Sequence, residues 1–166
     1  LCWKRRKKER SEGAMASVYD VARYILSKKG QITAMKLQKL VYYSQVWTLV
    51  WDEEELFPEQ IEAWANGAVV RALFRIHRGM FKVTEENFSI GDISSLSTSQ
   101  KSNIDKVLEF YGDYTAQELS DINHQEDPWV NARGDLHPMA NSSNEITKGA
   151  ILEYHSGIWN GKEETT

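Results

Sequence analysis

Cysteine is almost absent from this chain, since Cys2 is the one thiol among its 166 residues. A single cysteine excludes a framework of intrachain disulfides, and it also excludes a metal site made of several thiolates. Such a composition suits a reducing compartment, and we expect the protein to be cytoplasmic.

Long apolar segments are missing too. The longest run without a charged residue lies between Lys39 and Asp52, whereas a helix that crosses a bilayer needs about 20 apolar residues. We therefore expect no membrane span. Hydrophobic residues still make up 41% of the chain and aromatic residues 11%, which is enough for one globular domain with a core of its own.

Positive charge is scarce outside the first fourteen residues. Residues 1–14 contain six Lys or Arg and two Glu, so that 14 basic and 22 acidic residues remain from Met15 onward, a formal net charge of −8. The break in composition and the start-like sequence at Met15 indicate an upstream or tag-like basic tail outside the fold, rather than a nucleic-acid arm. We expect one helical domain over residues 15–166. Its acidity argues against nucleic acid as a partner, because DNA binding depends on neutralising phosphates.

Complete catalytic motifs are missing as well. His124 and Glu126 form an H-x-E pair, which two cysteines complete in zinc deaminases, but no cysteine follows Cys2. The phosphate-binding loop, the dinucleotide fingerprint and the motifs of serine hydrolases and zinc proteases do not occur. We therefore expect no enzymatic activity, no metal and no other cofactor. An uncharacterised enzyme that uses His124 and Glu126 remains an alternative.

A DNA-binding regulator is a further alternative, because residues 115–133 have the length of a helix-turn-helix motif. A helix that reads DNA needs basic and amide side chains. This one would offer Glu126, Asp127 and Trp129 with a single arginine, Arg133. The segment therefore indicates a packing role more than DNA recognition.

What the chain does contain is a helical period of apolar residues. One helix is bounded by Ser17, which can cap its start, and by Gly30 at its end. A second helix follows the N-cap Thr33, with Ile32 and Leu37 at the spacing of a hydrophobic staple. This second helix is apolar on nearly all sides, which is typical of a central helix with neighbours all round.

The rest of the chain carries weaker signals. Pro58 permits at most a short edge strand within residues 56–64. After a break at Gly67, the pattern of residues 68–79 indicates a helix with Val69 and Val70 turned inward. Four further signals mark helices: the stripe over Thr98–Tyr111, a capping box of Thr115 and Glu118, Asp127 as a cap with Pro128 at the first helical position, and a capping box of Ser142 and Glu145. The predicted fold is mainly α, a compact bundle of five to six helices around a central hydrophobic helix, with a minor short β element.

Three segments together resemble the Panacea domain, a family also described as SocA-like or GepA-like and common in prophages and other mobile genetic elements. They read "MKLQKLVYYSQVWTLV", "LFPEQIEAWANGAVVRALFR" and "LSDINHQEDPWVNAR", and the resemblance extends from Val18 to Ile158. Two positions depart from the family pattern, because Ala68 replaces the usual Pro after Gly67 and Asn123 replaces the usual Thr before His124. The matching motif residues, which we expect to be structural, are Leu37, Gln38, Leu40, Tyr42, Tyr43, Glu62, Trp64, His124, Glu126, Pro128 and Trp129.

The resemblance implies an antitoxin that neutralises a toxin protein encoded nearby, by direct protein–protein binding. A SocA-like adaptor that delivers the toxin to the ClpXP protease is the alternative within the family. We expect His124 and Trp129 to form a corner that fastens the short helix after Asp127 to the central helix. For the partner-binding surface we expect the turn near Gly67 and the exposed polar edge of the central helix. The residues of this surface are Lys36, Lys39, Gln45, Gly67, Ala68, Val69 and Val70.

Overall fold

The computed structural model of the chain describes residues 15–165, and the basic tail expected at 1–14 lies outside the described residues. The described part contains seven α-helices, rather than the five to six expected, together with five short strands and two 3-10 helices. The helices are α2 (Val18–Lys29), α3 (Ala34–Asp52), α4 (Arg71–His77), α5 (Thr98–Tyr111), α6 (Ala116–His124), α7 (Asp127–Arg133) and α8 (Lys148–Thr165). The strands are β1 (Ile32–Thr33), β2 (Ile61–Trp64), β3 (Gly67–Val70), β4 (Lys82–Val83) and β5 (Glu145–Ile146), and the 3-10 helices are η1 (Glu85–Phe88) and η2 (Ile93–Ser95).

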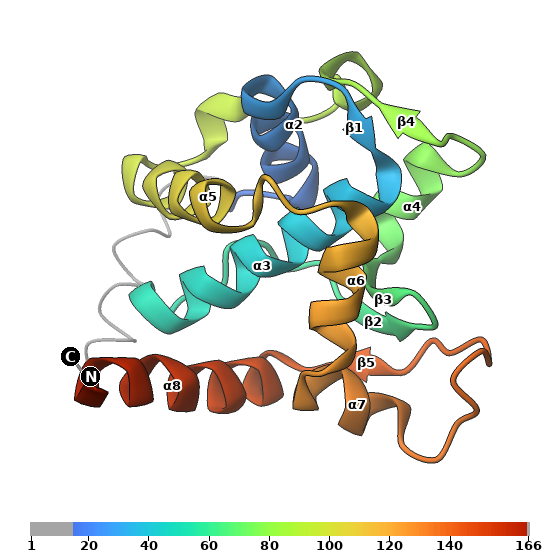
Figure 1. The fold of residues 1–166 in the computed structure, drawn as a ribbon. Helices are drawn as coiled ribbons and strands as arrows, with labels where there is room; N and C mark the ends of the chain where they lie inside the picture. Colours follow the sequence, from blue (N-terminus) through green and yellow to red (C-terminus); the bar gives the residue numbers. More distant parts are fainter. Residues whose placement is uncertain (1–14, 166) are drawn as a thin grey trace.

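Helix α3 is the central element, as its apolar pattern predicts. Figure 1 shows it crossing the middle of the molecule, between α2 and α5 on one side and α8 on the other, with α6 and the strands near its first half. Thirteen of its nineteen residues are buried, because neighbours cover it from every direction. The Thr33 hydroxyl accepts a hydrogen bond from the Lys36 amide at 3.1 Å, which confirms the predicted N-cap.

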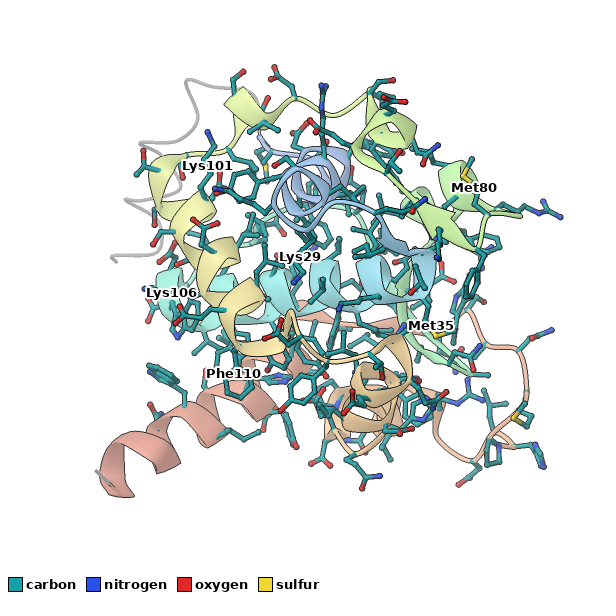
Figure 2. The ribbon with its side chains drawn as sticks, turned by 45° about the horizontal axis from the view of Figure 1, so that its top comes forward. Lys29, Met35, Met80, Lys101, Lys106 and Phe110 are labelled. Atoms are coloured by element: carbon teal, nitrogen blue, oxygen red, sulfur yellow. The ribbon has the colours of Figure 1, made fainter. Side chains whose placement is uncertain are left out.

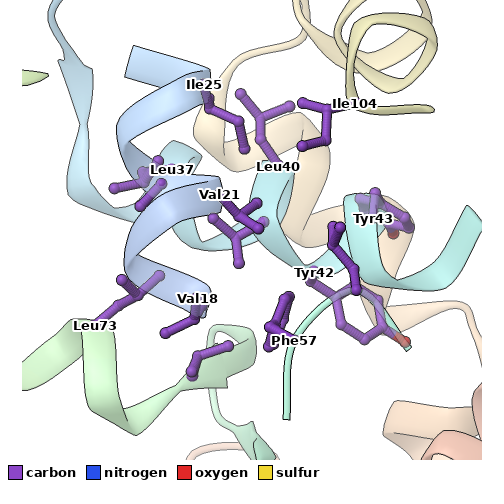
Figure 3. Close-up of a cluster of buried hydrophobic side chains, with 14 of the residues drawn as sticks. Val18, Val21, Ile25, Leu37, Leu40, Tyr42, Tyr43, Phe57, Leu73 and Ile104 are labelled. Atoms are coloured by element: carbon purple, nitrogen blue, oxygen red, sulfur yellow. The ribbon is translucent and has the colours of Figure 1, made fainter. Parts of the chain in front are cut away.

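One apolar contact inside the core joins α2 to α3 (Figure 3). Val18, Val21 and Ile25 lie on one apolar face of α2, and all three are fully buried. They face the fully buried Leu37 and Leu40 of α3. Burying one such side chain contributes about 1.5–3 kcal/mol to stability, so this seam holds the fold more strongly than any single polar contact.

A three-stranded antiparallel sheet, in the order β3-β2-β5, covers the first half of α3. The hairpin of β2 and β3 pairs Ile61 with Val70 and Trp64 with Gly67. Strand β2 is therefore the centre of this sheet and not an edge, because β5 pairs with its other side. The prediction that Val69 and Val70 belong to a helix is wrong, since they pair with β2 and the helix begins only at Arg71.

Most of the predicted helix caps are confirmed, but two helix starts shift. Ser17 and the pair Thr115–Glu118 form capping boxes. The expected box of Ser142 and Glu145 does not form, because Glu145 pairs with β2 and α8 starts only at Lys148. Glu126, one residue before the expected cap, occupies the N-cap of α7.

Candidate functional site

The amide of Gln38 fastens the hairpin to the central helix. Its Oε1 accepts from the Val70 N–H at 2.9 Å, and its Nε2 donates to the Val70 carbonyl at 3.1 Å. The same Nε2 lies 2.9 Å from His77 Nε2. Gln38 thus bonds the free edge of β3 as a neighbouring strand would, and burial together with the charge of Lys39 lowers the pKa of His77.

Lys39 and Gln45 are completely buried, so the expectation that they form an exposed polar edge is wrong. Lys39 Nζ donates to the Ala68 carbonyl at 3.0 Å, and burial lowers the pKa of this amine to about 7. Gln45 donates to the Phe57 carbonyl at 2.8 Å and accepts from the Leu56 N–H at 2.6 Å. Both side chains hydrogen-bond to backbone groups of segments that pack on α3. These polar residues of the helix are therefore buried and not exposed to solvent.

Gly67 and Ala68 lie against Lys39 and Asn123. Gly67 has φ +116°, and a Cβ there would come within 2.5 Å of Lys39 Cε and 2.7 Å of Asn123 Oδ1. The Ala68 N–H donates to Asn123 Oδ1 at 2.6 Å. The residues expected to bind a partner, Gly67 to Val70, are therefore mostly buried contacts between the hairpin, α3 and α6.

Glu126 is the centre of a buried polar network. Its Oε1 accepts from the Tyr43 hydroxyl at 2.8 Å and from Asn123 Nδ2 at 3.3 Å. Its Oε2 lies 3.4 Å from His155 Nε2, and His155 Nδ1 lies 3.0 Å from the Ile151 carbonyl. Burial and the negative charge of Glu126 raise the pKa of Tyr43. The carboxylate thus joins α3, α6 and α8 at the start of α7.

His124 and Trp129 do form a corner, with their rings stacked at 4.2 Å between centroids. Trp129 Nε1 donates to the Trp64 carbonyl at 2.8 Å, so the corner fastens α7 to β2 and not, as expected, to the central helix. Burial lowers the pKa of His124, and Pro128 is buried beside it. This stacked imidazole has a packing role.

Glu62 and Trp64 of the I-E-A-W motif hold the first residue of α4. Arg71 makes a bidentate contact with Glu62, at 3.0 and 2.8 Å, and the Trp64 indole donates to the same carboxylate at 2.9 Å. Burial acts to raise the pKa of Glu62, but the hydrogen bonds from Arg71 and Trp64 outweigh it, so the pKa is lowered. The Arg71 guanidinium also lies 5.4 Å from the Trp64 ring.

An open cleft of about 880 Å³ lies between the start of α3, the hairpin and α4. Its inner wall contains Gln38, Lys39 and His77, the polar side chains that hold the hairpin. Its outer lip is apolar, with Met80 41% exposed and Phe81 76% exposed. Met35 and Met80 appear on the right of Figure 2, on the far side of the molecule from Phe110. Lys36, the most accessible of the expected binding residues on α3, follows Met35 directly.

The sequence did not point to two residues that the fold depends on. Arg133 is buried, donates to the Ala63 carbonyl at 3.0 Å and holds the loop after α7 through the carbonyls of His137, Pro138 and Ala140. His155 closes the network of Glu126 from α8. Neither has a local signature for its long-range partner, which is the Ala63 carbonyl for Arg133 and Glu126 for His155.

Within residues 15–165, no three His, Cys, Asp or Glu side chains lie close enough together to hold a metal ion. Among the same residues, no helix combines the length and the apolar character that crossing a bilayer requires. Gln38 and Trp129 of the motif instead hydrogen-bond to backbone, and Tyr43 hydrogen-bonds to Glu126.

A comparison with protein families finds one match. Residues 37–130 match the sequence profile of the family described as "Antitoxin SocA-like, Panacea domain". This range contains most of α3, the hairpin, α4, α5, α6 and the start of α7, and thus most of the residues that line the cleft and most of the buried polar network. No curated protein and no solved structure matches the chain significantly.

Proposed function

The chain belongs to the SocA-like antitoxin family with a Panacea domain, and from this premise we propose that it neutralises a toxin protein encoded nearby by binding it, with no chemistry of its own. The observation that carries the proposal is the position of the family's polar motif residues. Gln38, Glu62 and Glu126 are buried and hydrogen-bonded inside the fold. A domain whose characteristic polar side chains build its own scaffold suits a binding module better than an enzyme.

The H-x-E pair offers the enzyme alternative little support. Glu126 already accepts from Tyr43 and Asn123, and His124 stacks on Trp129. A general acid or base must reach the proton that it transfers. Glu126 is buried beneath α8, away from the open cleft, so we assign this residue to stability.

Co-expression with the adjacent reading frame tests the proposal, in cells with and without ClpXP. We expect restored growth in both strains and a complex that co-purifies in a fixed ratio. Rescue only in the presence of the protease would assign the adaptor mechanism instead. Rescue by amounts far below those of the toxin, in protease-free cells, would contradict the binding mechanism and favour catalysis.

One variant separates catalysis from binding in this assay. His124→Ala removes the ring that an enzyme would need, and we expect it to retain neutralisation as long as the domain stays folded by circular dichroism. A folded His124→Ala protein that no longer neutralises, while it still binds the toxin, would revive the catalytic alternative.

A further inference from the structure

The cleft at the start of α3 has two faces of different chemistry. One face is apolar and aromatic, and the rings of Trp64 and Phe74 make an edge-to-face contact there with their centroids 4.9 Å apart. Three further apolar side chains lie at the opening, those of Met35, Met80 and Phe81. Phe81 is the most exposed large hydrophobic side chain of the described residues, at 76%. Exposed apolar side chains gathered at the mouth of a cleft are typical of a site that another molecule covers.

The other face is positively charged, although the body of the protein is acidic. Among the described residues that line the cleft there is no Asp or Glu, whereas the half-exposed Arg71 is present. Arg75 lies one helical turn after Arg71 and acts electrostatically on the same carboxylate, Glu62. Two guanidinium groups thus share one carboxylate, which leaves a surplus of positive charge beside the aromatic wall.

The surplus of positive charge beside the cleft favours a ligand that carries negative charge. Cations beside an apolar pocket attract carboxylates over long range and repel basic segments, and such charges set encounter rate and partner choice. The half-exposed Arg71 guanidinium can donate hydrogen bonds to a second carboxylate, because the Arg71 side chain is 43% exposed whereas that of Glu62 is only 12% exposed. Methionines at the opening adapt to apolar side chains of different shapes.

We propose that this cleft is the toxin-docking site, and that it receives a segment of the toxin in which an apolar or aromatic side chain is followed by a carboxylate. The apolar side chain packs on Trp64, Phe74 and the lip of Met80 and Phe81, and the carboxylate lies against Arg71 and Arg75. This inference rests on the proposed function and names the chemistry of the partner.

The first test needs no toxin. The wild-type protein is used to sort a displayed library of random short peptides, and the recovered sequences are read. We expect an apolar residue next to Asp or Glu, with binding that weakens as salt is added, because salt screens exposed charges. Recovery of basic peptides, of peptides without charge, or of no binders at all would overturn the proposal, as would self-association of the protein through the Phe81 lip.

Matched variants then locate the binding. Phe81→Ser and Arg75→Glu alter the lip and the charge of the cleft, and each should weaken peptide binding by about tenfold or more. Their controls are Phe110→Ser, at a side chain 60% exposed on α5, and Lys106→Glu on the same helix (Figure 2). All four positions are exposed, so the variants should fold. Equal loss in cleft and control variants would contradict a site in this cleft.

The toxin itself supplies the second test, in the co-expression assay. If the wild type neutralises and Phe81→Ser and Arg75→Glu do not, both the function and the docking site are supported. If the wild type and both cleft variants neutralise and co-purify equally, the docking site is wrong while the function stands. If the wild type does not neutralise, the function is wrong, and the peptide test alone decides whether the cleft binds acidic–apolar segments.

Discussion

Buried polar side chains are the residues that distinguish this domain from a simple apolar bundle. Lys39 shows that burying such a side chain is energetically unfavourable, because its amine is fully buried and donates one hydrogen bond, to the Ala68 carbonyl. Burial penalises the charged form of an amine, which is why its pKa falls to about 7. The folded protein therefore tolerates Lys39 best when it is neutral.

The first prediction concerns the pH dependence of stability. An unfolded lysine stays protonated up to its ordinary pKa of 10.5, so the unfolded chain binds more protons than the folded one between about pH 7 and that value. Stability should consequently rise with pH over this range, by on the order of 2 kcal/mol between about pH 7 and about pH 9. Lys39→Met keeps the apolar stem and should lose this slope, as measured by urea unfolding at several pH values. An unchanged slope in the variant would show that Lys39 is hydrated when folded.

The second prediction distinguishes a structural from a chemical role for Glu126. With a neutral side chain at position 126, His155 can keep its proton on Nδ1, which faces the Ile151 carbonyl, and use Nε2 as an acceptor. Glu126→Gln can place its amide N–H toward that Nε2 and its carbonyl toward Tyr43. We expect stability close to the wild type and full neutralisation of the toxin.

Glu126→Ala is the contrasting variant, because it leaves the buried Tyr43 hydroxyl, Asn123 amide and His155 ring without their shared acceptor. We expect a loss of about 3–5 kcal/mol in the free energy of unfolding, as for a broken buried ionic network. Thermal unfolding of the two variants side by side measures the difference. A stable Glu126→Gln protein that binds but fails to neutralise would assign chemistry to this carboxylate.

At the scale of elements, the hairpin and α6 are coupled by Ala68 and Asn123, the two positions at which the resemblance implies a departure from the usual residues of the family. Where the resemblance implies a proline, Ala68 has an N–H that is buried and bonded to Asn123 Oδ1 at 2.6 Å. Proline has no N–H to satisfy, so the residue at position 68 decides whether position 123 must supply an acceptor. The two departures thus meet in one hydrogen bond.

A double-mutant cycle tests this coupling. Asn123→Ala should cost about 1–3 kcal/mol, since it leaves the buried Ala68 N–H unpaired. Ala68→Pro in the Asn123→Ala background should cost less than Ala68→Pro in the wild type, a coupling energy that urea unfolding of the four proteins gives directly. Strictly additive costs would show that the hydrogen bond contributes nothing to stability.

The corner of α6 and α7 provides a further prediction. Trp129 is half-buried, stacked on His124 and bonded to the Trp64 carbonyl. Trp129→Ala should reduce the free energy of unfolding by about 3 kcal/mol, at the lower end of the range for a buried tryptophan. Trp129→Phe keeps the stacking and loses only the hydrogen bond, so about 1 kcal/mol is expected. If Trp129→Ala stays as stable as the wild type but no longer binds the toxin, the corner is an interface instead.

At the scale of the molecule, one helix organises the fold of the described residues, and the hydrophobic core includes the buried Ala16, two residues before α2. We predict that a chain starting at Met15 unfolds at the same temperature as the full chain, because residues 1–14 differ from the domain in composition and charge. Differential scanning calorimetry of the two chains measures this. A fall of several degrees, equivalent to about 1 kcal/mol, would show that the basic tail packs on the domain.

The sequence alone was sufficient for features that depend on near neighbours. Caps such as Ser17, Thr33 and Thr115 follow from a hydroxyl placed next to free backbone N–H groups, and these were predicted correctly. The central position of α3 also follows from its own residues, because a helix that is apolar all round must be covered on all sides. The family was also recognisable from three sequence segments, without knowledge of how these segments pack together in the fold.

Tertiary structure alone decided what the polar residues of α3 do. A lysine or glutamine on a helix favours exposure until a distant strand brings backbone groups to it, as β3 does for Lys39 and residues 56–57 do for Gln45. The strand at Val69 and Val70 has the same origin, since the ladder with β2 and the amide of Gln38 outweigh a local helical pattern. Likewise the cleft is made of residues from four separate segments. Local propensities amount to tenths of a kcal/mol per residue, whereas leaving a buried backbone group unpaired costs about 1–3 kcal/mol, so long-range pairing decides wherever the two conflict.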